Sequence, residues 1–242
     1  MNGLKKAILY SLKPHELGYC GPLCVKDSKN TLRRYLLGEK FTKNKIINLL
    51  DGFIGAKSYY KLIAGKNNIK DIYDEQVVEA YWVGNELLKK ITVQDLKKMI
   101  LSEFVKPKFL TKKKAEEIIE KIPKEVVAHH SFHVFFVSSI SGRVKIVKKR
   151  KDDCKSSCGQ VIQIYEKDQK VKIKTNKLFP NKKDVIIKID WNMQFVPNIK
   201  KGDFVSFHWG RISEKLTKTK YNNLIRYTNK NYIAYKKAYG EK

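Results

Sequence analysis

The stretch CKSSCGQVIQI, from Cys154 to Ile164, opens the part of the chain that decides the fold. Short segments of alternating apolar and polar residues follow it, and turn-forming residues such as those from Pro197 to Gly202 separate them. This pattern is typical of short β-strands joined by tight turns. It predicts a small OB-like β-barrel of four or five strands. The expected strands are Val161 to Tyr165, Val171 to Thr175, Val185 to Asp190 and Phe204 to Trp209.

The front part of the chain has the 3.6-residue periodicity of helices instead. One helix is expected from Thr42 to Ala64, with Thr42 as its N-cap, and another from Asp74 to Ile91. A third begins at Thr92, where Asp95 follows three residues later as in a capping box, and a fourth runs from Thr111 to Ile122. Only short connections separate these segments, which favours a compact helical bundle.

We therefore predict an α+β fold with a helical N-terminal domain and a barrel domain. The expected boundaries are a mainly helical domain over residues 1–141, a basic linker or exposed edge over 142–152, and a barrel with a C-terminal helix over 153–242. That last helix is expected from Thr217 to Ala238, with Thr217 as its N-cap. The segment from Val126 to Ile140 is apolar on both faces, so it is either a buried strand or a buried helix.

Composition indicates the cellular location of the protein and the kinds of partner it can have. No apolar run approaches the roughly 20 residues that a membrane-spanning helix needs, and the apolar stretch near Met1 is too short for a signal peptide. We expect a cytoplasmic protein with no membrane partner, whose four cysteines stay reduced. The net charge of +27 prompts a nucleic-acid hypothesis, but only 6 of the 51 basic residues are arginine, the residue that forks onto phosphate and guanine. Nucleic acid is therefore a disfavoured partner that stays open.

Two distant segments share a cysteine, glycine and histidine pattern. In the first, Cys154 is followed by four residues, Gly159, a polar residue and a strand. In the second, about fifty residues later, Lys201-Gly202 precedes a strand that ends in His208. The pair resembles the two ends of the barrel of HypC-type chaperones, which help to build the iron centre of nickel–iron hydrogenases.

The HypC resemblance implies a site. Cys154 would hold an iron fragment that carries carbonyl and cyanide ligands, with His208 nearby. The partners would be a hydrogenase maturation scaffold protein and the hydrogenase large subunit. More than 150 residues precede Cys154, so the free terminal amine of the family's cysteine is lost. Basic neighbours, Arg150, Lys151 and Lys155, are expected to favour the thiolate, and the acidic pair Asp152 and Asp153 to oppose it.

A second resemblance covers the front part. LGYCGP (Leu17 to Pro22), VVEAYWVGN (Val77 to Asn85) and HHSFH (residues 129–133) resemble an uncharacterised bacterial and archaeal family. That family pairs a helical front part with a barrel bearing the motif of cysteine, four residues and glycine. The resemblance implies architecture rather than chemistry. It suggests that Cys20, the histidines and Cys154 meet in one cleft between the two parts.

The cysteines also allow a zinc site. Cys20 and Cys24 are separated by three residues, and so are Cys154 and Cys158. Two such pairs could supply four thiolate ligands to a structural zinc ion. Zinc is thus the alternative to iron.

Three histidines are further candidates for contact with a metal or cofactor. His129 and His133 lie four residues apart and would share one face of either a helix or a strand. On a strand His130 would point away from them. Packed histidines of the core are the competing interpretation.

Three functions stay open at this level. The preferred hypothesis is an accessory metallochaperone in nickel–iron hydrogenase maturation, which holds or hands over an iron fragment through a cysteine thiolate. The second is an enzyme that supplies or delivers a diatomic iron ligand at an interdomain site. The third is an OB-like nucleic-acid-binding module, with Tyr165, Phe179, Trp191 and Phe195 available for base stacking. Phosphate-binding loops and serine nucleophile elbows are absent from the sequence.

Overall fold

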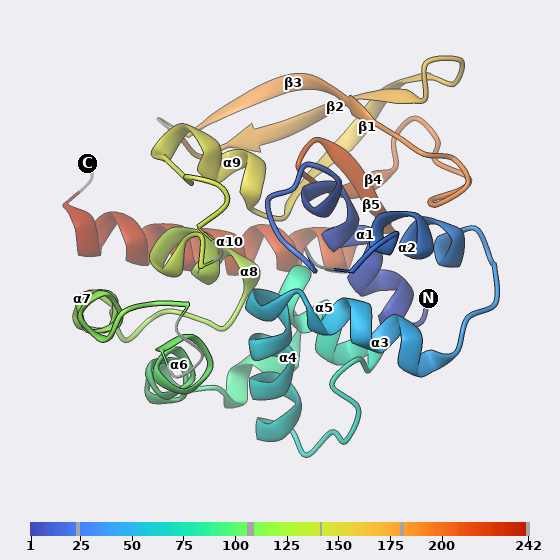
Figure 1. Cartoon of the computed structure of the whole chain (residues 1–242). Coiled ribbons are helices and arrows are strands. Elements are labelled where there is room, and N and C mark those ends of the chain that lie inside the picture. Colours follow the sequence, from blue (N-terminus) through green and yellow to red (C-terminus); the bar gives the residue numbers. More distant parts are fainter. Residues whose placement is uncertain (23–24, 106–108, 141, 180–181, 241–242) are drawn as a thin grey trace.

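The computed structural model describes residues 1–22, 25–105, 109–140, 142–179 and 182–240 (Figure 1). Helices form the front part of the chain: α1 (Gly3–Glu16), α2 (Ser28–Leu36), α3 (Lys43–Asp51), α4 (Ile54–Lys66), α5 (Glu75–Trp82), η1 (Glu86–Lys90), α6 (Val93–Ile100), η2 (Leu101–Val105), α7 (Lys112–Glu120), α8 (His130–Phe132) and η3 (His133–Val137). Two short turns, η4 (Lys148–Arg150) and α9 (Lys151–Cys154), lead into the strands β1 (Ser157–Tyr165), β2 (Lys170–Lys177), β3 (Lys183–Asp190), β4 (Phe204–His208) and β5 (Arg211–Leu216). The helix α10 (Lys218–Tyr239) follows.

The predicted helix starts are confirmed, because each depends on a local side-chain cap. Thr42, Thr111 and Thr217 each accept a hydrogen bond from the backbone N–H three residues later. Thr92 and Asp95 form a reciprocal capping box.

Two predicted helices are shorter than expected, and in both cases tertiary contacts explain the break. The segment from Thr42 to Ala64 is two helices, and the second continues to Lys66. At the break, a side chain on Gly52 would come within 2.7 Å of Pro22. The helix from Asp74 ends at Trp82, because Gly84 adopts a φ of +92° and packs directly against the ring of Tyr227.

The five strands form a closed barrel in the order β1-β2-β3-β5-β4, with β1 paired to β4. The β3–β5 pair is parallel, and the other neighbours are antiparallel. The four expected strands are present, and β5 is the additional one. The prediction of a barrel followed by a helix is therefore confirmed.

Helices and barrel share one core. A single cluster of buried apolar side chains includes Ile8 of α1, Val78 of α5, Val161 of β1 and Leu224 of α10. In Figure 1, α10 runs between the barrel strands and the front helices, and it contacts α8, η3, β1 and β4. The predicted domain boundaries stay predictions. No described helix is long and apolar enough to cross a membrane.

A buried amide fixes the segment that carries the histidines. The side chain of Asn231 in α10 accepts from the backbone N–H of Val127 (2.9 Å) and donates to its carbonyl (3.1 Å) and to Ser131 Oγ (2.9 Å). Within the stretch from Val126 to Ile140, which sequence periodicity leaves open, residues His130 to Val137 are helical, as α8 and η3.

We expect Asn231→Ala to lower the free energy of unfolding by about 2 kcal/mol, because it leaves the buried backbone N–H of Val127 without a partner, whereas the carbonyl of Val127 still accepts from the backbone N–H of His129. Urea unfolding at neutral pH measures this. Asn222→Ala, at an exposed position of the same helix, is the matched control. Equal stability of the two variants would contradict the role assigned to Asn231.

Candidate metal centre

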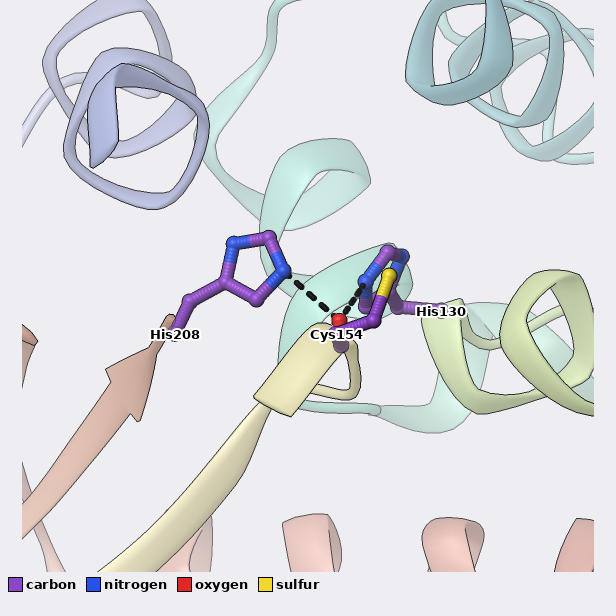
Figure 2. Close-up of side chains that lie close together, drawn as sticks. All are labelled: His130, Cys154 and His208. Carbon is purple, nitrogen blue, oxygen red and sulfur yellow. Dashed lines mark hydrogen bonds between the residues drawn. The ribbon is translucent and has the colours of Figure 1, made fainter. Parts of the chain in front are cut away.

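Three segments far apart in the sequence each place one potential ligand at the same point. His208 is the last residue of β4, Cys154 ends α9 just before β1, and His130 begins α8. One ring nitrogen of each histidine and the sulfur of Cys154 lie within 4.8 Å of one another. Figure 2 shows the two rings approaching Cys154 from opposite sides. This group could hold a metal ion.

Each imidazole is oriented by an oxygen on the side away from Cys154. Nδ1 of His130 lies 2.9 Å from the hydroxyl of Tyr81, and Nδ1 of His208 lies 2.6 Å from the carbonyl oxygen of Tyr10. The Nε2 atoms of His130 and His208 lie 2.8 and 2.7 Å from the carbonyl oxygen of Cys154. Histidines that bind metals in proteins are commonly held in this way, with the other nitrogen bonded to a carbonyl or hydroxyl oxygen.

His208 has too few protons to donate a hydrogen bond to both of the oxygens that face its ring. Both of its ring nitrogens face carbonyl oxygens, yet a neutral imidazole carries only one N–H. A second proton would serve both oxygens, but burial lowers the pKa of His208 to about 4, so the ring is neutral at pH 7. One lone pair of His208 therefore faces a carbonyl oxygen without a hydrogen between them.

A metal cation removes this conflict. With Nδ1–H donating to Tyr10, the lone pair of Nε2 on His208 would face the cation, and so would the carbonyl oxygen of Cys154. Burial also lowers the pKa of His130 well below its usual value, so both rings offer lone pairs at neutral pH. The donor set thus fits a cation better than it fits protons alone.

The pKa of the Cys154 thiol differs from what its sequence neighbours suggest. Burial, with smaller effects from Cys20 and Asp153, raises its pKa well above the usual value. The prediction that basic neighbours favour the thiolate is wrong, because those side chains are engaged elsewhere. Lys151 donates to the carbonyl of Phe135 (3.1 Å), Lys155 pairs with Asp152 (3.1 Å), and Arg150 lies over Tyr19. A bound cation would make Cys154 ionise near neutral pH, because a thiol that coordinates a metal loses its proton.

A cavity of about 130 Å³ adjoins the cluster. Five of the residues singled out in the sequence line it: Cys20, His130, His133, Cys154 and His208. Nδ1 of His133 is buried there and has no hydrogen-bond partner among the described residues. Burial lowers the pKa of His133 to about 4 and raises that of Cys20 to about 12.

The cavity wall includes a strained residue. Ser138 lines it and has φ 67° and ψ −150°, a region that glycine adopts almost alone. Ser138 directly follows the π-helical turn η3, which begins with His133. Strain of this kind and π-helical turns are both frequent at functional sites.

The remaining candidates lie away from the cluster. His129 bonds Ser131 through Nδ1, and burial lowers its pKa to about 3. Cys158 lines a separate pocket beside Tyr221 of α10, and burial raises its pKa to about 12. Cys24 lies outside the described residues. The described cysteines therefore do not gather into the predicted four-thiolate zinc site.

Sequence reasoning missed the residues that support the ligands. Trp82 packs against both rings, with centroids 4.3 Å from His130 and 5.2 Å from His208, and it stacks on Tyr10 at 4.9 Å. Tyr81 and Trp82 fall within VVEAYWVGN, a segment that the family resemblance had marked. Nothing in the sequence indicated Tyr10, because it acts through its backbone carbonyl.

A family model described as a family of unknown function (DUF6390) matches residues 2–240. The chain belongs to this family. The match spans both the helices and the barrel, and so includes all three potential ligands. No curated protein and no solved structure matches the chain.

We expect the metal-free protein to lose stability as the pH falls below about 6.5, the usual pKa of histidine. Unfolding exposes His129, His133 and His208, which then take up protons that the folded chain accepts only near pH 3 to 4. Each contributes about 1.4 kcal/mol per pH unit between the two pKa values. Urea unfolding between pH 7 and 5, with a chelator present, measures the slope. His133→Gln should reduce the slope by one proton, and an unchanged slope would contradict this assignment.

Proposed function

We propose that this protein holds a transition-metal ion through His130, Cys154 and His208, and that the resident ion acts on a small molecule in the adjoining cavity. The convergence of two oriented Nε2 atoms on Cys154 carries the proposal. Three protein ligands with one side open to a cavity are typical of catalytic metal sites.

The ligand types favour iron or zinc. Two imidazoles and one thiolate suit borderline and soft transition metals and do not suit magnesium or calcium. Iron is the metal that the HypC resemblance implies, and zinc is the alternative. The metal would lower the pKa of the Cys154 thiol and would polarise a molecule bound to its open side.

Burial supports a resident ion over a travelling one. His130 and His208 are only 5% and 4% exposed. Thiolate exchange with a partner protein would need the partner's ligands to reach the metal, whereas a small molecule needs only the cavity. Burial of the histidines therefore favours the hypothesis of an enzyme that supplies or delivers a diatomic iron ligand over that of a carrier.

The second candidate is the metallochaperone of nickel–iron hydrogenase maturation, with a scaffold protein and the hydrogenase large subunit as partners. One observation favours it: Cys154 and His208, which the resemblance pairs, are in contact through the carbonyl oxygen of Cys154 and Nε2 of His208.

The strand order with its parallel β3–β5 pair supports the proposal that the barrel is OB-like. Hand-over would require the front helices to move away from the barrel. Cys20, Cys154 and Cys158 are free thiols, which suits the cytoplasmic location that either role implies.

The nucleic-acid hypothesis loses most of its support. Phe179, Trp191 and Phe195 are 4%, 4% and 8% exposed, so they cannot stack on bases. Trp191 also donates its indole N–H to the carbonyl of Val196 inside the protein.

Metal content tests the proposal directly. We expect protein purified without oxygen to contain about one iron or zinc ion per chain. Cys154→Ala and His208→Ala should lose it, because each leaves only two ligands. Cys158→Ala is the matched control and should keep it. Metal retained equally by all variants, or absent from the wild type after reconstitution, would refute the site.

An infrared spectrum of the same samples, after co-expression with hydrogenase maturation proteins, separates the two candidates. Carbonyl and cyanide bands that disappear in Cys154→Ala would favour the iron-fragment carrier. Bound metal without such bands would favour the resident centre.

We expect metal affinity to rise about tenfold per pH unit between pH 6 and 8. Over this range both histidines are already neutral, and only the Cys154 thiol has a proton to release. Competition titrations with a chelator of known affinity measure the slope. In Cys154→Ala any residual binding should be nearly independent of pH, and a slope of two or more protons in the wild type would show that a histidine is protonated.

A further inference from the structure

The cavity beside the metal centre limits the size of what can bind. Its volume is about 130 Å³, and a dry cavity of about 150 Å³ is enough for benzene. A molecule with a short carbon chain fits within this volume, whereas a whole nucleotide or a peptide would extend out of it. The cavity is therefore a site for a small molecule.

The lining of the cavity is mostly apolar and carries one positive charge among the described residues. Apolar side chains make up most of it, including Phe53, Ile54, Phe109 and Ile140. Among the described residues of the lining, Arg143 is the charged side chain, and none is acidic. An occupant should thus combine a short apolar body with a group that suits a positive environment.

Arg143 is fixed in position. Its Nη2 donates to the carbonyl of Gly21 at 2.7 Å. Gly21 itself packs closely on His15 and Phe53, because a side chain at this position would come within 2.7 Å of both. Its charge also lowers the pKa of Cys20, although burial dominates and the pKa stays raised. The guanidinium is therefore held at the wall formed by the loop of Cys20.

The metal adds to the positive charge. A divalent ion bound by two neutral imidazoles and one thiolate keeps a net charge of about +1, and Arg143 contributes another. In an apolar cavity these charges favour an anion strongly over a neutral molecule.

We infer that the cavity binds a short-chain carboxylate, with its carboxylate attracted by Arg143 and the metal and its carbon chain against the apolar wall. A guanidinium and a carboxylate are matched in shape and charge. The inference rests on the proposed metal centre, and it names the class of substrate or ligand on which that centre acts.

Spectroscopic titration of the cobalt(II)-loaded protein tests the inference without requiring an activity. Cobalt bound to thiolate and imidazole has visible and near-ultraviolet bands that change when the open position gains a ligand or its surroundings change. Formate, acetate and propionate are the probes. Propionamide is the neutral control of the same shape, azide is the inorganic anion, and benzoate tests the size limit.

We expect propionate to change the bands in a saturable way and to bind more tightly than formate, because its chain gains apolar contact. Arg143→Gln should weaken propionate about 10- to 100-fold, as expected for lost hydrogen bonds to a charged group. Arg143→Lys keeps the charge and should recover part of the affinity. Lys145→Gln, at an exposed position two residues away, should match the wild type.

The other outcomes have defined meanings. If cobalt binds but the carboxylates change nothing, or if Arg143→Gln binds propionate as the wild type does, the inference is overturned and the metal centre stands. Equal binding of propionamide also overturns it, and binding of azide alone shows an inorganic anion site. If cobalt does not bind, the metal centre itself is refuted and the inference falls with it.

Discussion

The convergence of two imidazoles on the carbonyl oxygen of Cys154 is the constraint on which the candidate site depends. It joins three parts of the chain: α8 through His130, the segment before the barrel through Cys154, and the barrel through His208. Because the three parts also share one apolar core, the position of each ligand is set by packing across the whole molecule. Any cation bound there would be bound by the folded state alone, and binding would stabilise the fold by mass action.

Burial, rather than net charge, determines the chemistry of this cluster. The chain carries a net charge of +27, which alone would favour a thiolate and disfavour protonated histidines everywhere. Exposed lysines are screened by salt over about 10 Å, so they act weakly on a buried sulfur. Desolvation is the largest cause of the shift in the pKa of His130, Cys154 and His208 alike. It keeps all three groups neutral until a cation enters.

Local features of the fold could be predicted from the sequence, and features that depend on distant contacts could not. The caps at Thr42, Thr92 and Thr217 were predictable, because the partner atoms lie three residues away. The break before α4 was not, because it depends on how Pro22 packs against Gly52. In the site, the pairing of Cys154 with His208 could be predicted from a family resemblance. The choice of His130 over its neighbours could not, because Asn231, about a hundred residues away, sets the turn that aims it.

Buried ion pairs and a hydrogen bond hold α1 in the position from which it contacts His208 of the barrel. Lys6 of α1 is fully buried, and its Nζ lies 2.7 Å from Glu79 and 3.6 Å from Glu214 of β5. Glu214 in turn accepts a hydrogen bond from the hydroxyl of Tyr10 at 2.9 Å. Both contacts fix α1 against β5, and α1 thereby presents the carbonyl of Tyr10 to His208. A buried ion pair is costly to form and contributes little net stability, but breaking it is strongly destabilising, so it enforces one arrangement of its neighbours. In this protein, that arrangement is the one that turns Nε2 of His208 toward Cys154.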